Sequence, residues 1–458
     1  MKRIPLIRFD AFAAYARKPM IRLLCDELSW FEHGGERVLG VVVRDRSDDD
    51  FGGHIFGKDR NARYRWIGST GFHERRRHAE VDLRREMERH AAMPDEEYYQ
   101  DDEQGQPVDF FAPLANENKL HPSFKALRDA EAYSAARGII EPMMRWYQDA
   151  DGNFIEQFQT AGFDARIWEL YLFAAFTEMN FEIFRIHAVP DFCCSNPVGA
   201  FTVEAVTVNP SRDATGAIVP PPPTETPEQI QAFIRDYMPI KFAGPLKAKL
   251  EKRYWEKPHV GDKPLVFAIQ DFSAPGSMVH SRSAFERYIH GYEHDWERRD
   301  DGTLVIKPRK IGVHKWRAKE VPSGFFDLPD SEHISAVLFS NSGTISKFNR
   351  MGALAGFGSE RLRLVRVGTA LNHDPNATAP FVFERAVKDP RYKESWAEGI
   401  DVWHNPRAVH PLDPNLLPDV AHHWLLPDGN VKSLAPDWHP FGSMTLHSLV
   451  EDEAVVPY

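Results

Sequence analysis

The chain is poor in cysteine and has no long apolar run. Three cysteines in 458 residues, Cys25, Cys193 and Cys194, are too few for a disulfide framework, so the cytoplasm is the expected location. No stretch approaches the roughly 18 uninterrupted apolar residues of a membrane span, so no membrane partner is expected. Charged residues follow soon after residues 1–5, and no signal peptide is expected.

Positive charge is also in deficit. The chain has 56 Lys and Arg residues against 67 Asp and Glu residues, which gives a net charge of −11. A negative total argues against a protein that coats nucleic acid without specificity. It does not exclude a local basic groove, for which residues 75–77 with 84–85, and residues 247–253, are the candidates.

The length suffices for two or three domains, and the apolar and charged fractions of 42% and 27% are ordinary for a globular protein. We expect an α/β fold overall, α+β by domain. The oligomeric state is not fixed by the sequence, and a homo-oligomer stays open. The expected parts are an N-terminal β-rich domain with a trailing helix (1–93), a linker and helical segment (94–154), an α/β core (155–275) and a C-terminal mixed α/β domain (276–458).

The central part gives the clearest pattern of elements. A helix, three strands, a helical region and a further strand predict an α/β core whose last crossover sets one strand parallel to an earlier one. The expected elements are a helix over 165–179, strands over 181–186, from about 191 and over 202–208, helices over 227–237 and 245–255, and a strand over 264–269.

Three acidic residues in this part can converge. Glu169 stands alone in the apolar run 167–176, and a buried carboxylate must be paired or must hold a metal. Asp191 and Glu204 lie on adjoining strands, and the backbone carbonyl of Ala205 could add another oxygen. Hard cations such as Mg²⁺ prefer oxygen ligands, so this set indicates a divalent-metal site.

The same residues resemble the motif of the PD-(D/E)XK nuclease superfamily, with the likeness limited to about residues 155–275. Pro190-Asp191 resembles its PD, the segment that begins at Glu204 resembles its E-x-K, and Glu169 resembles its first-helix glutamate. The order of expected elements also matches the core of that family. The resemblance therefore implies a restriction-endonuclease-like core between two other domains.

One position departs from the family motif. Val206 stands where the family has its lysine, and some members supply that lysine from the following helix. Here Lys249 is the first choice because it lies next to apolar helix positions, with Lys247 and Lys252 as alternatives.

The resemblance implies a nuclease that uses Mg²⁺ or Mn²⁺ to hydrolyse phosphodiester bonds of DNA, with RNA as the alternative substrate. Defence against foreign DNA is a role suggested by analogy alone. The implied catalytic residues are Glu169, Asp191, Glu204 and Lys249, and the implied metal ligands are Glu169, Asp191, Glu204 and Ala205.

Other interpretations remain open. Asp191 could cap a turn, Glu204 could face solvent, and Glu169 could pair with an arginine such as Arg166. The fold could also be a catalytically inactive binding or scaffold protein, an option that Val206 favours. A zinc-dependent hydrolase is a further alternative, based on a late group of histidines. That group is His404, His410, His422, His423, His439 and His447.

Overall fold

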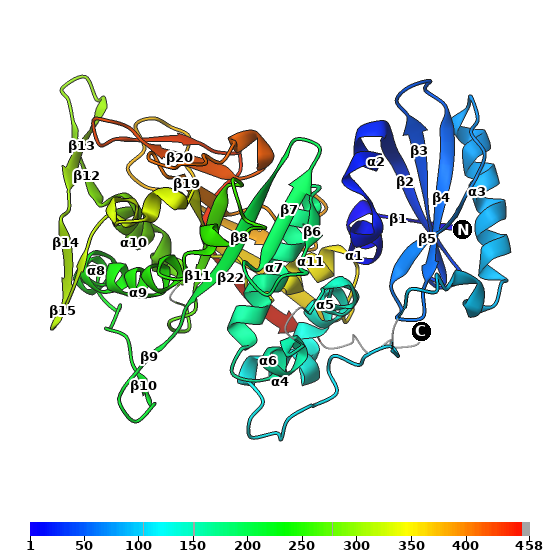
Figure 1. Ribbon diagram of the computed structural model, residues 1–458, viewed down its shortest axis with the longest axis horizontal. Helices are drawn as coiled ribbons and strands as arrows, with labels where there is room; N and C mark the ends of the chain where they lie inside the picture. Colours follow the sequence, from blue (N-terminus) through cyan, green and yellow to red (C-terminus); the bar gives the residue numbers. More distant parts are fainter. Residues whose placement is uncertain (104, 150–151, 277, 451–458) are drawn as a thin grey trace, which may run out of the picture.

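The computed structural model describes residues 1–103, 105–149, 152–276 and 278–450. Figure 1 shows an N-terminal sheet at one end of the long axis and a larger mixed body of sheet and helices beside it. The class is therefore mixed α/β, as the sequence predicts. In the part of the chain described, every helix is too short or too polar to cross a membrane.

The N-terminal sheet is antiparallel, with its strands paired in chain order. Strand β3 is buried along most of its length because helices cover both faces of the sheet. Leu39 and Val41 pack on the side of Phe9 from α1, whereas Val38 packs with Leu83 from α3. The elements are β1 (Lys2–Ile4), α1 (Leu6–Ala13), α2 (Pro19–Leu24), β2 (Cys25–His33), β3 (Val38–Asp45), β4 (Phe51–Lys58), β5 (Tyr64–Ser69) and α3 (Arg76–Ala91).

Four helices lead from this sheet into the main body: α4 (Pro122–Asp129), α5 (Ser134–Trp146), α6 (Phe154–Gln159) and α7 (Phe163–Glu178). Helix α5 packs against α11 (Ile345–Leu354) at a point where only glycine fits. A Cβ at Gly352 would overlap the backbone oxygen of Ala135. The missing side chain therefore sets how closely the two helices approach.

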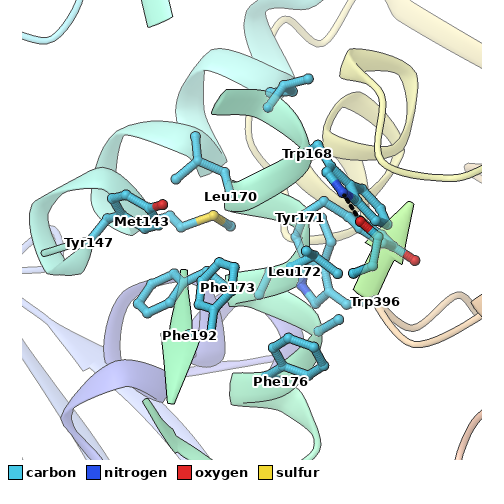
Figure 2. Close-up of a cluster of buried hydrophobic side chains, with 14 of the residues drawn as sticks. Met143, Tyr147, Trp168, Leu170, Tyr171, Leu172, Phe173, Phe176, Phe192 and Trp396 are labelled. Atoms are coloured by element: carbon cyan, nitrogen blue, oxygen red, sulfur yellow. Dashed lines mark hydrogen bonds between the residues drawn. The ribbon is translucent and has the colours of Figure 1, made fainter. Parts of the chain in front are cut away.

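Helix α7 lies at the centre of the largest apolar cluster, and Figure 2 shows its side chains pointing in several directions. Residues 167–176 are all buried, which is the pattern of a helix with neighbours on all sides rather than of an amphipathic surface helix. The indole Nε1 of Trp168 donates a hydrogen bond to the backbone oxygen of Ala268 at 3.0 Å. This bond joins α7 to the central sheet.

The central sheet is mixed, with the strand order β21-β20-β19-β16-β11-β8-β7-β6. Strands β6, β7 and β8 are antiparallel neighbours, β11 is parallel to β8, and β16 is parallel to β11. The strands are β6 (Glu182–Phe184), β7 (Phe192–Asn196), β8 (Gly199–Val208), β11 (Leu265–Asp271), β16 (Ala336–Ser340), β19 (Ile400–His404), β20 (Ala421–Leu425) and β21 (Val431–Leu434).

This sheet continues beyond residue 275, where the sequence analysis places a domain boundary. Strand β16 pairs in parallel with β11, and the late strands β19 to β21 extend the sheet on that side. Apolar side chains of β11 and β16 share both large core clusters, which explains why the later segment adds to the sheet instead of forming a separate core.

The helical region between β8 and β11 differs from its expected form. Helices are expected over 227–237 and 245–255. The structure has α8 (Pro227–Ala232), a short π-helix over Phe233–Tyr237, and then α9 (Met238–Leu250), which runs through Pro245. Proline costs a helix one hydrogen bond. Burial of Phe242, Leu246 and Leu250 on one side of α9 offsets that cost.

The remaining strands form small pairs and a short sheet around this body. Strands β18, β17 and β22 make an antiparallel sheet. Helix α10 packs on the central sheet through Phe285, whose ring contacts those of Phe339 in β16 and Trp403 in β19. The elements are β9 (Ser211–Arg212), β10 (Ile218–Val219), α10 (Met278–His290), β12 (Tyr292–Arg298), β13 (Leu304–Lys310), β14 (Val313–Trp316), β15 (Lys319–Pro322), β17 (Leu362–Ala370), β18 (Phe381–Ala386) and β22 (Pro440–Leu449).

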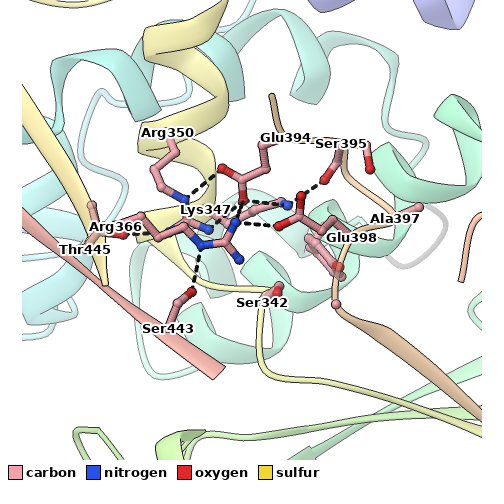
Figure 3. A network of polar contacts seen from close by, with 12 residues as sticks. Ser342, Lys347, Arg350, Arg366, Glu394, Ser395, Ala397, Glu398, Ser443 and Thr445 are labelled. Carbon is pink, nitrogen blue, oxygen red and sulfur yellow. Dashed lines mark hydrogen bonds and ion pairs between the residues drawn. The ribbon is translucent and has the colours of Figure 1, made fainter. Parts of the chain in front are cut away.

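A buried ion cluster joins α11 and β17 to the loop before β19 (Figure 3). Glu394 lies 2.8 Å from the Lys347 ammonium and 2.7 Å from Nη2 of Arg350, and Arg366 contacts both Glu394 and Glu398. Burial alone would raise the pKa of Glu394, but the surrounding cations, Arg350 first, hold it well below its usual range. The carboxylate therefore stays charged and fixes the loop to the two elements.

Candidate functional site

Strands β7 and β8 bring Asp191 and Glu204 side by side. Phe192 pairs with Val203 in the antiparallel register. Asp191, which precedes Phe192, therefore lies opposite Glu204, which follows Val203. The backbone N–H of Ala205 donates to Oδ2 of Asp191 at 2.7 Å. The Asp191 carboxylate thus binds the neighbouring strand just where β7 begins.

Glu204 is buried, with an exposed fraction of 2%, rather than facing solvent. Its Oε1 accepts hydrogen bonds from the Tyr254 hydroxyl at 2.7 Å and from the Lys249 ammonium. Its Oε2 is buried and, among the described residues, has no hydrogen-bond partner. An unpartnered carboxylate oxygen at this depth is costly and can readily accept a cation or a water.

Lys249, on helix α9, lies beside Glu204, as the sequence predicts. The ion pair with Glu204 is direct, and about a third of the Lys249 side chain is exposed. Lys247 and Lys252 instead lie on the exposed side of this segment, where Lys247 is 3.8 Å from Glu251. The choice among the three lysines therefore agrees with the apolar spacing of the helix.

Burial dominates the electrostatics of Asp191. The pKa of Asp191 is raised well above its usual range, first by burial and then by the charges of Glu169 and Glu204. The Ala205 N–H and the Lys249 ammonium oppose this shift without cancelling it. Burial and Glu204 also raise the pKa of the Tyr254 phenol, which keeps this group a hydrogen-bond donor. A bound cation would relieve the crowding of carboxylates.

Glu169 is engaged by basic side chains, as one of the sequence interpretations anticipates. Nη1 of Arg166 lies 2.7 and 2.9 Å from its two oxygens, Nη2 of Arg185 lies 3.4 Å from Oε2, and the Tyr147 hydroxyl donates to the same oxygen. Two guanidinium groups satisfy a buried carboxylate without a metal. Glu169 therefore acts on Asp191 through its charge.

The three acids do not form a compact ligand set. Within the described ranges, Asp330, Glu332 and His333 are the only group of three such residues whose ligand atoms all lie within 4.8 Å of one another. That group is partly exposed, and Asp330 is already paired with Arg253 at 2.8 Å. Glu169, Asp191 and Glu204 are thus not among the compact groups of the described residues, and Glu169 is already occupied by two arginines.

The expected basic strip beside the site is only partly free. Arg253 pairs with Glu256 at 2.7 Å as well as with Asp330, and Lys247 lies near Glu251. Exposed pairs of this kind contribute little energy and exchange readily with other anions. The paired acids reduce the net positive charge of the strip.

Sequence reasoning missed several residues of this site. Tyr254 follows α9 and reaches Glu204, while Tyr147 and Arg185 reach Glu169 from α5 and from the end of β6. Aromatic and arginine residues occur throughout the chain, so no local pattern singles these out. Their roles follow from contacts between segments distant in sequence.

Four of the six late histidines are buried and hydrogen-bonded, whereas His410 is half-buried and His447 is exposed. His404 bonds His422 at 2.9 Å, and His423 and His439 both bond Asp401, at 2.8 and 2.9 Å. Burial, with His422 and His423 nearby, lowers the pKa of His404 to about 3. Across the described residues, none of these histidines belongs to a compact group of three metal ligands. The zinc-hydrolase interpretation gains no support from this geometry.

Comparison with family models, with curated proteins and with solved structures finds no match for this chain. What the site can do is therefore argued from its own geometry. That geometry is a pair of adjoining carboxylates on β7 and β8, one with a free oxygen, beside a lysine from α9.

Proposed function

We propose that this protein is a metal-dependent nuclease with a restriction-endonuclease-like core built from α7, β6, β7, β8, α9 and β11. The order of these elements, with three antiparallel strands and then a crossover to a parallel strand, supports the proposal. The proposed substrate is DNA, with RNA as the alternative. The three free cysteines fit a cytoplasmic location.

The observation that carries the proposal is the buried, unpartnered Oε2 of Glu204 beside Asp191. Two carboxylates and a backbone carbonyl are a hard oxygen set, which suits Mg²⁺ or Mn²⁺ completed by waters. The raised pKa of Asp191, caused first by burial and then by the charges of Glu169 and Glu204, supports a site that a cation would stabilise. The residues present therefore fit a divalent cation, with Glu169 outside the ligand set.

The remaining residues supply positioning and charge. A cation bound here would activate a water and neutralise charge on the phosphoryl group. Lys249, which replaces the lysine absent at Val206, neutralises a scissile phosphate beside Glu204. Tyr254 holds Oε1 of Glu204 in place, which leaves Oε2 for the cation.

The test is the substitution Glu204→Gln, which removes the charge and keeps the shape. We expect loss of Mn²⁺- and Mg²⁺-dependent cleavage of single- and double-stranded DNA, together with loss of the Mn²⁺-induced rise in Tm. Glu251→Gln on the same helical segment is the matched control, because its side chain is 66% exposed. Cleavage by Glu204→Gln at the parental rate would refute the assignment.

A second substitution separates an active nuclease from an inactive scaffold of the same fold. Lys249→Met should abolish cleavage while the Mn²⁺-induced rise in Tm persists, because Asp191 and Glu204 keep their oxygens. A parent protein that binds Mn²⁺ and DNA but cleaves neither DNA nor RNA would establish the scaffold interpretation instead. A parent that binds no metal would exclude both roles for the carboxylate pair.

A further inference from the structure

A polar cavity of about 270 Å³ lies where the N-terminal segment meets α7 and β6. It is separate from the carboxylate pair of β7 and β8. Its walls come from the segment around α2, from the end of α5, from α7 and from the strand that leads to Arg185. The cavity therefore brings together parts of the chain that are more than a hundred residues apart.

Four basic side chains line this cavity, and three of them already have carboxylate partners: Arg17, Lys18 and Arg185. Arg17 pairs with Asp10 and Glu27, Lys18 with Glu182, and Arg185 with Glu169. Arg22 has no carboxylate within ion-pair distance among the described residues, and its one recorded bond goes to a backbone oxygen at 3.4 Å. Burial and the nearby Arg17 guanidinium lower the pKa of Arg22. Asp10, Glu27 and Glu178 oppose this shift through their charges, but within the described residues none of them forms a direct ion pair with Arg22.

Three buried hydrogen-bond donors of the lining also lack partners within the described part of the chain. They are Nε of Arg17, Nε1 of Trp146 and Nη1 of Arg185. The Arg17 and Arg185 side chains are only 6% and 8% exposed. Buried donors are rarely left unbonded in native proteins. Three of them on one cavity indicate a ligand rich in acceptor oxygens.

Several of the other lining residues are aromatic. Tyr15 and Phe173 stack with ring centres 5.0 Å apart, and Phe181 and Phe184 lie with them along the cavity, as does the Trp146 indole. Flat apolar walls of this kind suit a planar ring. The volume lies just below the roughly 300–1,000 Å³ of typical ligand sites, which limits the occupant to a small molecule.

We propose that this cavity binds a nucleoside monophosphate, with the phosphate at the arginines and the base against the aromatic residues. Arg22 supplies a charge that no direct ion pair takes up, and the unpartnered donors of Arg17, Trp146 and Arg185 supply hydrogen bonds to phosphate oxygens. Arg185 also contacts Glu169 at 3.4 Å. The ligand site and the carboxylate site are thereby joined through one side chain, but binding at the cavity does not rest on the nuclease assignment.

Isothermal titration calorimetry of the full chain tests the proposal. The probes are the common nucleoside monophosphates, the matching nucleosides and inorganic phosphate. Arg22→Gln removes a charge that no carboxylate needs, so the variant should fold, and it should weaken monophosphate binding about 10-fold or more. Trp146→Phe removes one donor and part of the aromatic wall and should weaken binding less, because the arginine charges remain. Arg85→Gln on the exposed face of α3 is the matched control and should bind as the parent does.

Each alternative outcome contradicts a specific part of the proposal. No measurable binding of any monophosphate at millimolar concentration would exclude the site. Equal affinity for nucleoside and monophosphate would exclude the phosphate contacts, and equal affinity for inorganic phosphate would reduce the site to an anion hole without base recognition. Parental affinity in Arg22→Gln would place the binding elsewhere. Loss of DNA cleavage in Glu204→Gln with intact monophosphate binding would show that the two sites are independent.

Discussion

Replacing Glu178 by Gln should stabilise the protein at alkaline pH and have little effect at acid pH. Glu178 ends α7, and its Oε2 accepts the backbone N–H of Ala397 at 3.0 Å. Burial is the main cause that raises the pKa of this carboxyl to about 7 from its usual 4.5. Because the folded state holds the proton more tightly than the unfolded state, folding is penalised once the unfolded chain has lost that proton.

The magnitude follows from this difference in pKa. Each unit is about 1.4 kcal/mol, so a shift from 4.5 to about 7 corresponds to about 3 kcal/mol of stability. The penalty is absent below pH 4.5, grows as the pH rises to about 7, and is complete at pH 8. The side chain is partly exposed, so solvent screening reduces the expected value to about 2 kcal/mol.

Urea unfolding of the parent and of Glu178→Gln at pH 5 and pH 8 measures this effect. We expect the variant to gain about 2 kcal/mol relative to the parent between the two conditions. The amide changes the hydrogen bond to Ala397 by about 1 kcal/mol, but that change is the same at both pH values and cancels in the comparison. A gain below about 0.5 kcal/mol would refute the argument from burial.

Further predictions concern the site, the ion cluster and the α5–α11 contact. Because the pKa of Asp191 is raised, Mn²⁺ must compete with a proton at this carboxylate. The Mn²⁺-induced rise in Tm should therefore grow with pH, and a rise that is the same at pH 5 and pH 8 would contradict this. Glu394→Gln leaves buried cations uncompensated and should cost about 3–5 kcal/mol in urea unfolding, whereas Glu360→Gln on the surface should cost under about 0.5 kcal/mol. Gly352→Ala should lower the free energy of unfolding by about 3 kcal/mol or more. Gly244→Ala in α9, where the added Cβ meets open space, should raise it by about 0.5–1 kcal/mol. Equal effects of the two substitutions in urea unfolding would exclude the steric reason.

Local pattern predicts the elements of the core but not its extent. The apolar run of α7, the β-branched β8 and the buried β11 lie where periodicity and composition place them. The extension of the sheet by β16 and β19 was not predicted. Strand β16 pairs in parallel with β11 and β19 pairs antiparallel with β16, and both pairings join segments more than 50 residues apart, which leaves no local signal. The sequence also predicts a helix that begins at Pro245, whereas α9 runs through this proline. The burial that offsets the cost of the proline depends on tertiary packing and cannot be predicted from local sequence.

The site shows the same division between local and distant information. The i to i+3 spacing of Arg166 and Glu169 and the placing of Lys249 between apolar helix positions are local, and both contacts exist. The contact of Arg185 with Glu169 and that of Tyr254 with Glu204 depend on the folded path of the chain. The acids could therefore be predicted from the sequence, but their hydrogen-bond partners could not. Those partners occupy Glu169 and leave Oε2 of Glu204 without a hydrogen bond in the described residues.

The close approach of α5 and α11 has a consequence for how the chain is made. About 200 residues separate the end of α5 from the end of α11, and a ribosome adds about 5–20 residues each second. For about 10–40 s, therefore, the nascent chain carries α5 without the helix that covers it. Ala135 and Ala136, which contact α11 in the folded protein, lack that cover during the interval. Newly synthesised chains are thus most exposed to aggregation and to chaperone capture before α11 emerges, although the N-terminal sheet is already complete.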